Sequence, residues 1–264
     1  MTLESEILKR LESVKKDINE SKKVEPVNEM INSSAKNRGD KIVKNGRITY
    51  APPKVASRIL LVFDATGSMS PLWDSTRQIM NEMVKRITDV GNVKLKCIAY
   101  RDYCDGPYIF EKSEWHSEAN PLINFIMGIK CAGGGDTPEA VEDALKLAHD
   151  EKEMVTRVIL IGDAPPHSIE KAGVQAVNLK KAGRPVFAFR VGNDDSTREA
   201  FKHIAKLSDG AYGDLRDYND LLDMISITIV HDVGGSAEVN KYLKKYDTSA
   251  YVKTYSQSLP SYKK

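Results

Sequence analysis

The stretch Arg58-Ile-Leu-Leu-Val-Phe-Asp64-Ala-Thr66-Gly-Ser68-Met69 decides the fold of this 264-residue chain. Its first half is a short apolar run of the kind that forms a buried strand. Its second half changes abruptly to a carboxylate, two hydroxyls and a glycine. Ser70-Pro71 follows, which is a helix N-cap with proline at the first helical position. The stretch therefore predicts a strand, a polar loop and a helix in direct succession.

The same alternation of apolar strands and amphipathic helices continues to about residue 230. Further strands are predicted at 93–100, 158–161, 186–191 and 211–215, and helices at 72–87, 121–127, 138–148, 168–181 and 218–230. Alternation of this kind is typical of an α/β fold with a mainly parallel sheet.

The segments on either side lack this alternation. One apolar stripe on a helix over 1–19 is formed by Leu3, Ile7, Leu11, Val14 and Ile18. Residues 20–56 are polar, with turn signals such as Asn45-Gly46, and are predicted to be a linker. We therefore expect an amphipathic helix at 1–19, a linker at 20–56, one domain at 57–231 and a tail at 232–264.

The predicted tail is rich in lysine and tyrosine. Tyrosines interleaved with lysines can stack on single-stranded nucleic acid. Packing of these tyrosines on a protein surface is the preferred interpretation, because amphipathic tyrosines and a partly ordered chain end are common.

Overall composition excludes several classes of partner. Lys and Arg total 39 against 37 for Asp and Glu, and this net charge of +2 gives no general attraction to nucleic acid or to an anionic membrane. Apolar runs are far shorter than the ~20 residues that span a bilayer, and the N-terminus does not resemble a signal peptide. The three cysteines, Cys97, Cys104 and Cys131, lack CxxC spacing and indicate free thiols in a reducing compartment. We therefore expect a cytoplasmic protein.

Three oxygen-rich segments follow strands or begin helices in the predicted fold. They are Asp64-Ala-Thr66-Gly-Ser68, Gly133-Gly-Gly-Asp136-Thr137-Pro-Glu139 and Gly162-Asp163-Ala-Pro-Pro. Because the loops after parallel strands meet at one edge of a sheet, the three segments can form one site. Their hydroxyls and carboxylates, without His or Cys, favour a hard cation such as Mg²⁺ or Mn²⁺. Singly, Thr137 and Ser68 are also good helix caps, and Asp163 is also a good turn residue.

The spacing in the first segment suits one cation. Alternate residues of an extended loop point the same way, so Asp64, Thr66 and Ser68 can present three oxygens to one point. Mg²⁺ keeps water where the protein supplies few ligands, which leaves an open position. A carboxylate of a partner protein can fill that position.

Asp64-Ala-Thr66-Gly-Ser68 resembles the Asp-x-Ser-x-Ser start of the metal-ion-dependent adhesion site of von Willebrand factor A domains, with Thr66 replacing the first serine. Thr137, after its glycine-rich loop, is similar to the family's metal-binding threonine, and Asp163 to its final aspartate. The resemblance covers about residues 57–230. It implies a Rossmann-like, doubly wound, mostly parallel six-stranded sheet with helices on both faces.

The resemblance also implies roles for the metal-site residues. Thr66, Ser68 and Thr137 would contact the metal directly, while Asp64 and Asp163 would act largely through water. In amino-acid sequence, the second and third segments look closest to the A domains attached to alpha-type protein kinases. Asp136 and Glu139 are extra acids relative to the adhesion-receptor pattern, and either one at the metal would leave less positive charge to attract a partner's carboxylate.

Two other functions compete with this interpretation. A haloacid-dehalogenase-like phosphotransferase also places an aspartate after its first strand, but it needs a second one two positions later, where Thr66 stands here. His167, beside Pro165-Pro166, is interpreted as a loop residue rather than an acid or base. A scaffold with a vestigial metal site is the third possibility. The favoured prediction is a non-enzymatic module that binds a protein partner, which supplies an Asp or Glu, through Mg²⁺ or Mn²⁺.

Overall fold

A computed structural model of the chain describes residues 41–44, 47–50, 57–71, 73, 82, 86 and 93–260. The chain divides into two compact units, residues 1–55 and 56–264. The helix predicted over 1–19 and most of the one predicted over 72–87 lie outside the described residues, although Ser70, Pro71, Trp73, Glu82 and Arg86 are helical.

The first unit contains a small hairpin. Strand β1 (Lys41–Lys44) pairs antiparallel with β2 (Arg47–Tyr50). The sequence analysis predicts only a polar linker here. The Asn45-Gly46 dipeptide between two short runs of β-branched residues is the signal that could have found the hairpin, because this pair favours a two-residue loop.

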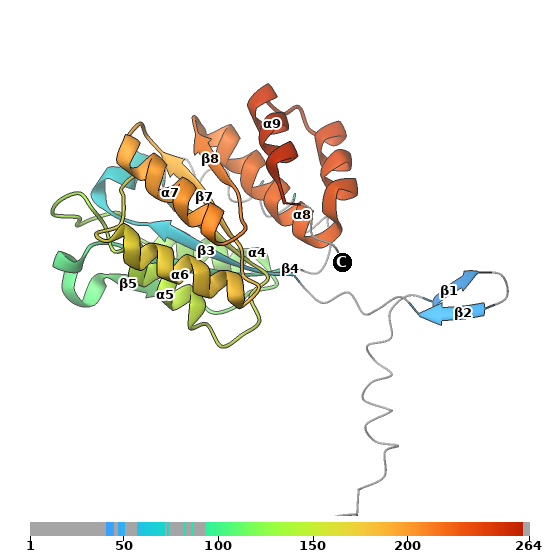
Figure 1. The fold of residues 1–264 in the computed structure, drawn as a ribbon, viewed down its shortest axis with the longest axis horizontal. Coiled ribbons are helices and arrows are strands. Elements are labelled where there is room, and N and C mark those ends of the chain that lie inside the picture. The colour runs from blue at the N-terminus through green and yellow to red at the C-terminus, as the bar shows by residue number, and fades with distance from the viewer. Residues whose placement is uncertain are drawn as a thin grey trace, which may run out of the picture. The chain divides into compact units, whose positions relative to one another are not determined.

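The second unit is built on a six-stranded sheet in the order β5-β4-β3-β6-β7-β8 (Figure 1). Its strands are β3 (Ser57–Asp64), β4 (Val93–Tyr100), β5 (Phe110–Lys112), β6 (Arg157–Gly162), β7 (Val186–Val191) and β8 (Tyr212–Leu215). Among these described strands, neighbours pair in parallel except β5 with β4. The predicted fold class, a mostly parallel six-stranded α/β sheet, is confirmed.

Helices surround this sheet. The short 3-10 helices are η2 (Gly67–Met69) and η3 (Tyr103–Tyr108). The α-helices are α4 (Ala119–Gly128), α5 (Val141–His149), α6 (Ile169–Lys181), α7 (Asp195–Leu207), α8 (Tyr218–Lys245) and α9 (Ala250–Ser258). Neither β5 nor α7 is predicted from the sequence, because β5 has three residues and α7 shows few large apolar side chains.

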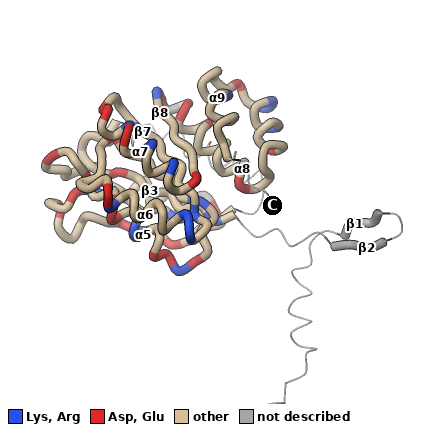
Figure 2. Tube along the Cα trace, viewed as in Figure 1, with Lys and Arg blue, Asp and Glu red and all other residues tan. Residues whose placement is uncertain are grey.

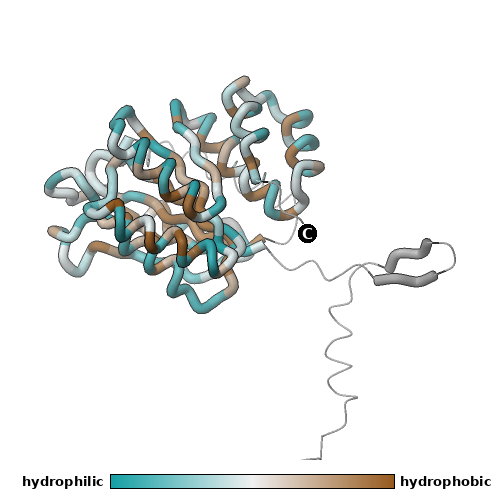
Figure 3. Tube along the Cα trace, in the orientation of Figure 1, coloured by the Kyte–Doolittle hydropathy of each residue, from teal (hydrophilic) through white to brown (hydrophobic). Residues whose placement is uncertain are grey.

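Strand β3 explains why both faces of the sheet are covered. Ile59, Leu61 and Phe63 lie in a core that includes residues of α4, α8 and α9. The alternate residues Leu60 and Val62 lie in a second core with α5, α6 and α7. A strand buried on both faces needs a continuous apolar run, and Figure 3 shows such residues along the central strands.

Strand order places the predicted site. The chain passes from β3 to β4 on one side and later to β6 on the other side of β3. The strand order therefore reverses at β3 and β6, and such a switch point opens a crevice at the carboxyl ends of the strands. Asp64 ends β3 and Asp163 follows β6, so both lie at this crevice.

The start of α5 differs from the prediction. The helix begins at Val141 rather than at Pro138. Instead of entering the helix, Glu139 donates its backbone N–H to the carbonyl oxygen of Pro165, at 3.0 Å, and forms a bridge with Pro166. This pairing ties the loop before α5 to the loop after β6.

The C-terminal segment also differs from the predicted tail. Helix α8 continues beyond the predicted end at residue 230 to Lys245, interrupted at Gly235, where φ is +65°. Helix α9 follows and packs on the sheet: Val252 and Tyr255 are buried in the same core as β3. The described tyrosines of this segment, Tyr242, Tyr246, Tyr251 and Tyr255, all lie in or against this core. Among the described residues, no helix is both long and apolar enough to cross a membrane.

We predict that Tyr255→Ala destabilises the second unit by about 3–5 kcal/mol, the range for removing a buried aromatic side chain. Tyr255 is 4% exposed, contacts the ring of Phe189 and shares a 2.7 Å hydrogen bond with Thr228. Urea unfolding measures the loss. Tyr108→Ala, at a position 72% exposed, is the matched control and should change stability little. Equal effects of the two substitutions would contradict the packing of α9.

Candidate metal centre

The loop after β3 gathers three side-chain oxygens. Asp64 is fully buried, and its Oδ1 accepts hydrogen bonds from the backbone N–H of Thr66 at 2.9 Å and from the Thr66 hydroxyl at 2.6 Å. The Thr66 Oγ1 lies 3.2 Å from the Oγ of Ser68. Because Ser68 is exposed while Asp64 is buried, the group runs from the protein interior to its surface.

Other elements hold this loop in place. The indole N–H of Trp73 donates to the backbone oxygen of Asp64 at 2.7 Å, and the Trp73 ring lies 5.2 Å from that of Phe63. The N–H of Ala65 donates to the carbonyl of Tyr100 at the end of β4, at 2.8 Å. The three oxygens are thus presented by an anchored backbone rather than by a free loop.

Asp163 comes close to Asp64 from the neighbouring strand. A Cβ added to Gly162 would lie 3.3 Å from Oδ2 of Asp64 and 2.5 Å from the hydroxyl of Tyr100, so no larger residue fits between the strands. Within the described residues, Oδ2 of Asp64, Oδ1 of Asp163 and the Tyr100 hydroxyl are buried without a hydrogen-bond partner. Buried polar atoms are nearly always paired, so such a group indicates a missing ligand.

Glu139 adds a third carboxylate. It is 4% exposed, and its Oε2 also has no hydrogen-bond partner among the described residues. A Cβ on Gly134 would lie 2.9 Å from Oε1 of Glu139 and 3.0 Å from Cβ of Thr66, so glutamate and threonine flank the same glycine. From the sequence, Glu139 is only an extra acid, because a helix predicted from Pro138 would carry it away from the loop.

The electrostatics agree with this crowding of carboxylates. The pKa of Asp64 is raised to about 7, mainly by burial and also by the nearby Asp163, against the opposing hydrogen bonds from Thr66. Burial, followed by the charges of Asp64, Asp102 and Asp163, raises the pKa of Glu139 to about 9. Both carboxyls therefore bind protons more readily than usual, and a cation placed among them would favour their ionised forms.

Thr137, the remaining predicted ligand, is exposed in the loop before Glu139. It makes no hydrogen bond to Asp64, Thr66, Ser68 or Asp163, all of which lie in the described part of the chain. Its role as a ligand stays a prediction. The glycine loop itself is ordered by Asp105, whose Oδ2 accepts from Gly134 N–H at 3.1 Å.

His167 contributes to the support of the site rather than to its donors. Its Nε2 lies 2.5 Å from Oδ1 of the buried Asp102, and its ring lies 4.7 Å from that of Tyr103. These contacts join the loop after β4 to the loop after β6. They agree with the interpretation of His167 as a loop residue.

The donor set suits a hard cation. Within the described residues, no three His, Cys, Asp or Glu side chains are arranged to hold a metal ion by themselves. A metal here therefore depends on the hydroxyls of Thr66 and Ser68 in addition to the carboxylates. Oxygen-only donors of this kind match Mg²⁺ or Mn²⁺ rather than a metal that prefers sulfur or imidazole.

The chain belongs to the von Willebrand factor A domain family, which it matches over residues 58–225. Domains of this family generally mediate protein interactions.

One curated relative is a protein of Acanthamoeba polyphaga mimivirus whose name includes "ariadne-like RING finger protein". It is 42% identical over 111 residues, which are 41% of this chain and 11% of the viral protein. The chain therefore corresponds to a small part of that relative.

Solved structures share the fold at low sequence identity. The pilus adhesin SpaC from Lactobacillus rhamnosus GG gives a TM-score of 0.54 at 14% identity, covering 75% of this chain and 31% of that one. Proximal thread matrix protein 1 from the mussel byssus, with a zinc-occupied metal-ion-dependent adhesion motif, gives 0.51 at 20% identity, covering 69% and 46%. The chain spans less than half the length of either.

We predict that the metal-free protein loses stability as pH rises from 6 to 9, because carboxyls with raised folded-state pKa values bind more protons folded than unfolded. Protonated Asp64 contributes to the free energy of unfolding. This contribution is fully present below the ordinary pKa of an aspartate and is lost once the pH has passed about 7, a change on the order of a few kcal/mol. Thermal unfolding in EDTA measures it. Saturating Mg²⁺ should abolish the fall, since it selects the ionised forms.

The control for this prediction is Asp64→Asn combined with Glu139→Gln, which removes both titrations. The difference between the wild-type and double-variant melting temperatures should become smaller as the pH is lowered. A difference that is constant across this pH range would contradict the raised pKa values.

Proposed function

We propose that this chain is a protein-binding module whose A domain holds one divalent cation, Mg²⁺ or Mn²⁺, and binds a carboxylate of a protein partner through it. The observation that carries the proposal is the convergence of unpartnered oxygens of Asp64, Asp163 and Glu139 beside the hydroxyls of Thr66 and Ser68. A cation would pair these oxygens, and the exposed side of the group leaves room for an outside ligand.

Each residue has a distinct role in this proposal. The Thr66 hydroxyl donates a hydrogen bond to Asp64, so the lone pairs of its oxygen remain available to the metal. Ser68 offers its hydroxyl from the exposed side, and Thr137 would approach from the glycine loop. Glu139 is the candidate for a direct carboxylate ligand, while Asp64 and Asp163 would act on the metal largely through water.

The three carboxylates also determine how strongly the cation binds and how strongly the bound cation attracts the partner's carboxylate. A second negative ligand tightens cation binding and lowers the positive charge that remains for the partner. We therefore infer tight metal binding and a moderate metal-dependent affinity for the partner's Asp or Glu. When bound, the metal supplies an electrophilic contact for that carboxylate.

The relatives support this proposal at the level of class. The mussel structure has zinc in the corresponding motif, and the bacterial neighbour is a pilus adhesin. The viral relative is named as a RING finger protein, in which the similar region is a small part. We infer that the present module serves recognition within a cytoplasmic assembly, as the wording shared with the A domains of alpha-type kinases also suggests.

An enzymatic role is not part of the proposal. The haloacid-dehalogenase-like mechanism needs an acid two residues after its nucleophile, and Thr66 occupies that place with its hydroxyl bonded to Asp64. A vestigial scaffold would bind its partner equally well with and without metal. Phosphate release from a phosphate monoester and the effect of EDTA on partner capture separate these alternatives.

We predict that Glu139→Gln weakens Mn²⁺ binding at least about tenfold, because it removes a charged ligand. The fold should tolerate the change, since the raised pKa keeps this carboxyl protonated near neutral pH in the absence of metal and glutamine resembles that form. Isothermal titration calorimetry measures the affinity. Asp195→Asn, at an exposed position outside the site, is the control.

Wild-type affinity for Mn²⁺ in both Glu139→Gln and Asp64→Asn would rule out this metal centre. Loss in Asp64→Asn alone would retain the centre and remove Glu139 from its ligands.

A further inference from the structure

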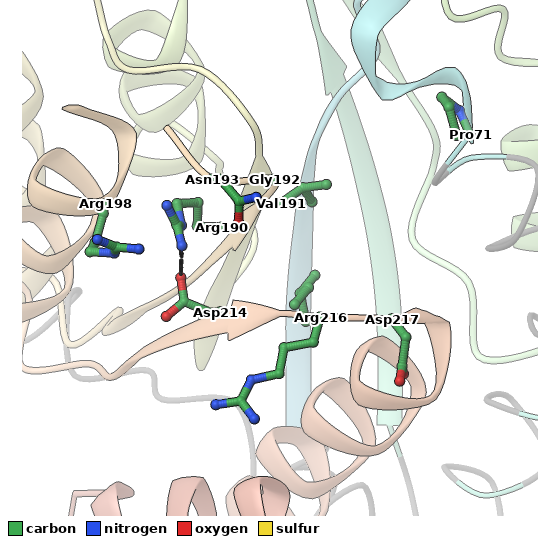
Figure 4. A pocket seen from close by; sticks show the side chains of 10 residues that line it. Pro71, Arg190, Val191, Gly192, Asn193, Arg198, Asp214, Arg216 and Asp217 are labelled. Atoms are coloured by element: carbon green, nitrogen blue, oxygen red, sulfur yellow. Dashed lines mark hydrogen bonds and ion pairs between the residues drawn. The ribbon is translucent and has the colours of Figure 1, made fainter. Parts of the chain in front are cut away.

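A second recess lies on the carboxyl edge of the sheet, where β7 and β8 end (Figure 4). It has a volume of about 680 Å³ and is lined by polar residues that include Arg190, Arg198, Arg216, Asn193, Asp214 and Asp217. We call it the arginine pocket. Figure 2 shows acidic and basic residues interspersed along the chain trace of this unit, and the arginine pocket brings three arginines together.

The two acids of the arginine pocket already have partners. Asp214 accepts from Arg190 at 2.7 Å and from the hydroxyl of Tyr212 at 2.5 Å. Asp217 caps α8, with its Oδ1 accepting from the N–H groups of Asn219 and Asp220. Arg190 is therefore paired within the fold, and the three arginines of the pocket outnumber its two acids.

The guanidinium of Arg216 is held in place with N–H donors available to an anion. Its guanidinium carbon lies 3.8 Å above the centre of the Tyr251 ring, and the Tyr251 hydroxyl is fixed by the backbone N–H of Asp214 at 2.7 Å. Arg216 is exposed and makes no ion pair with any residue that the structure describes. A guanidinium stacked on a fixed ring keeps its edge donors free, at little further cost in side-chain entropy.

Arg198 supplies the second available guanidinium. Its ion partner is Asp195, three residues earlier on α7 and 81% exposed. An exposed pair of this kind contributes little, so a ligand can compete for the arginine. In Figure 4 the side chains of Arg198 and Arg190 lie next to one another at the rim of the pocket.

The arginine pocket adjoins the candidate metal centre. Pro71, which lines it, lies three residues after Ser68, at the start of the helical segment that follows the loop after β3. On the other side, the Arg190 guanidinium donates to the carbonyl of Asp194 at 2.9 Å. The Asp194 side chain accepts from the backbone N–H of Thr197, and the Thr197 hydroxyl donates to the carbonyl of Asp163 at 3.0 Å. The two sites therefore share the backbone that positions them.

We propose that the arginine pocket binds a second carboxylate of the same acidic protein segment whose first carboxylate reaches the metal. This inference rests on the proposed function. Two fork-shaped guanidiniums suit planar carboxylates, which they bind in pairs of parallel hydrogen bonds. An extended acidic segment lying across the carboxyl edge would meet the metal and then Arg216 and Arg198, which makes the module selective for closely spaced acids over a single Asp or Glu.

The test uses a fluorescein-labelled oligoglutamate peptide, whose binding to the full chain with saturating Mn²⁺ is followed by fluorescence polarisation. The double variant Arg198→Gln, Arg216→Gln should weaken binding at least about tenfold, as expected for losing charge-assisted hydrogen bonds. The control, Lys146→Gln with Lys180→Gln, removes the same charge from exposed positions on α5 and α6 and should change binding less than about twofold.

Calorimetry with Mn²⁺ alone distinguishes the two proposals. An unchanged Mn²⁺ affinity in the arginine double variant, together with weaker peptide binding, supports the arginine pocket as a separate anchor. Peptide binding that is lost in this variant but insensitive to EDTA would support the arginine pocket and contradict the metal mechanism. Equal weakening in the arginine and lysine variants, or a wild-type protein that binds inorganic phosphate but not the peptide, would overturn the inference.

Discussion

Three carboxylates held close together, the buried Asp64 and Glu139 and the half-buried Asp163, are the feature on which the proposed function of this domain depends. Asp64 and Asp163 are brought together by neighbouring parallel strands, and Glu139 is added by a loop that pairs with the one after β6. Their mutual repulsion and burial are unfavourable unless protons or a cation neutralise them. In the proposed centre, the hydroxyls of Thr66 and Ser68 would give a cation additional oxygen ligands at this place.

The fold stabilises this arrangement through contacts far from the acids themselves. Trp73 fixes the backbone oxygen of Asp64, and Asp102 and His167 join two of the loops around it. On the other side, Thr197 fixes the backbone of Asp163 and belongs to the helix that lines the arginine pocket. In the proposed function, an edge fixed by these contacts would keep a metal and a pair of guanidiniums at a constant spacing, which would favour selective recognition of an acidic segment.

Much of the architecture follows from the sequence because the strands are continuous apolar runs between polar loops. The residues 186–191 form the predicted strand. Asp64, Thr66 and Ser68 lie together as expected, although Ser68 belongs to the 3-10 helix η2 and not to the extended loop from which their proximity was predicted. Glu139 could not be assigned, because Thr137-Pro138 is a strong helix-start signal, whereas long-range hydrogen bonds of Glu139 to Pro165 and of Ala140 to Arg101 hold this segment out of the helix. The tyrosines beyond residue 232 carry no periodic signal strong enough to show which of them pack into the core.

The central claim is that a divalent cation lies between Thr66, Ser68 and the carboxylates around them. Its most direct test is a crystal structure of the protein grown with Mn²⁺, measured at a wavelength where manganese scatters anomalously. We predict one strong anomalous peak within coordination distance, about 2.0–2.3 Å, of the Thr66 and Ser68 hydroxyls and of a Glu139 oxygen. Diffraction of good quality with no peak at this edge of the sheet, or with manganese bound only elsewhere, would contradict it.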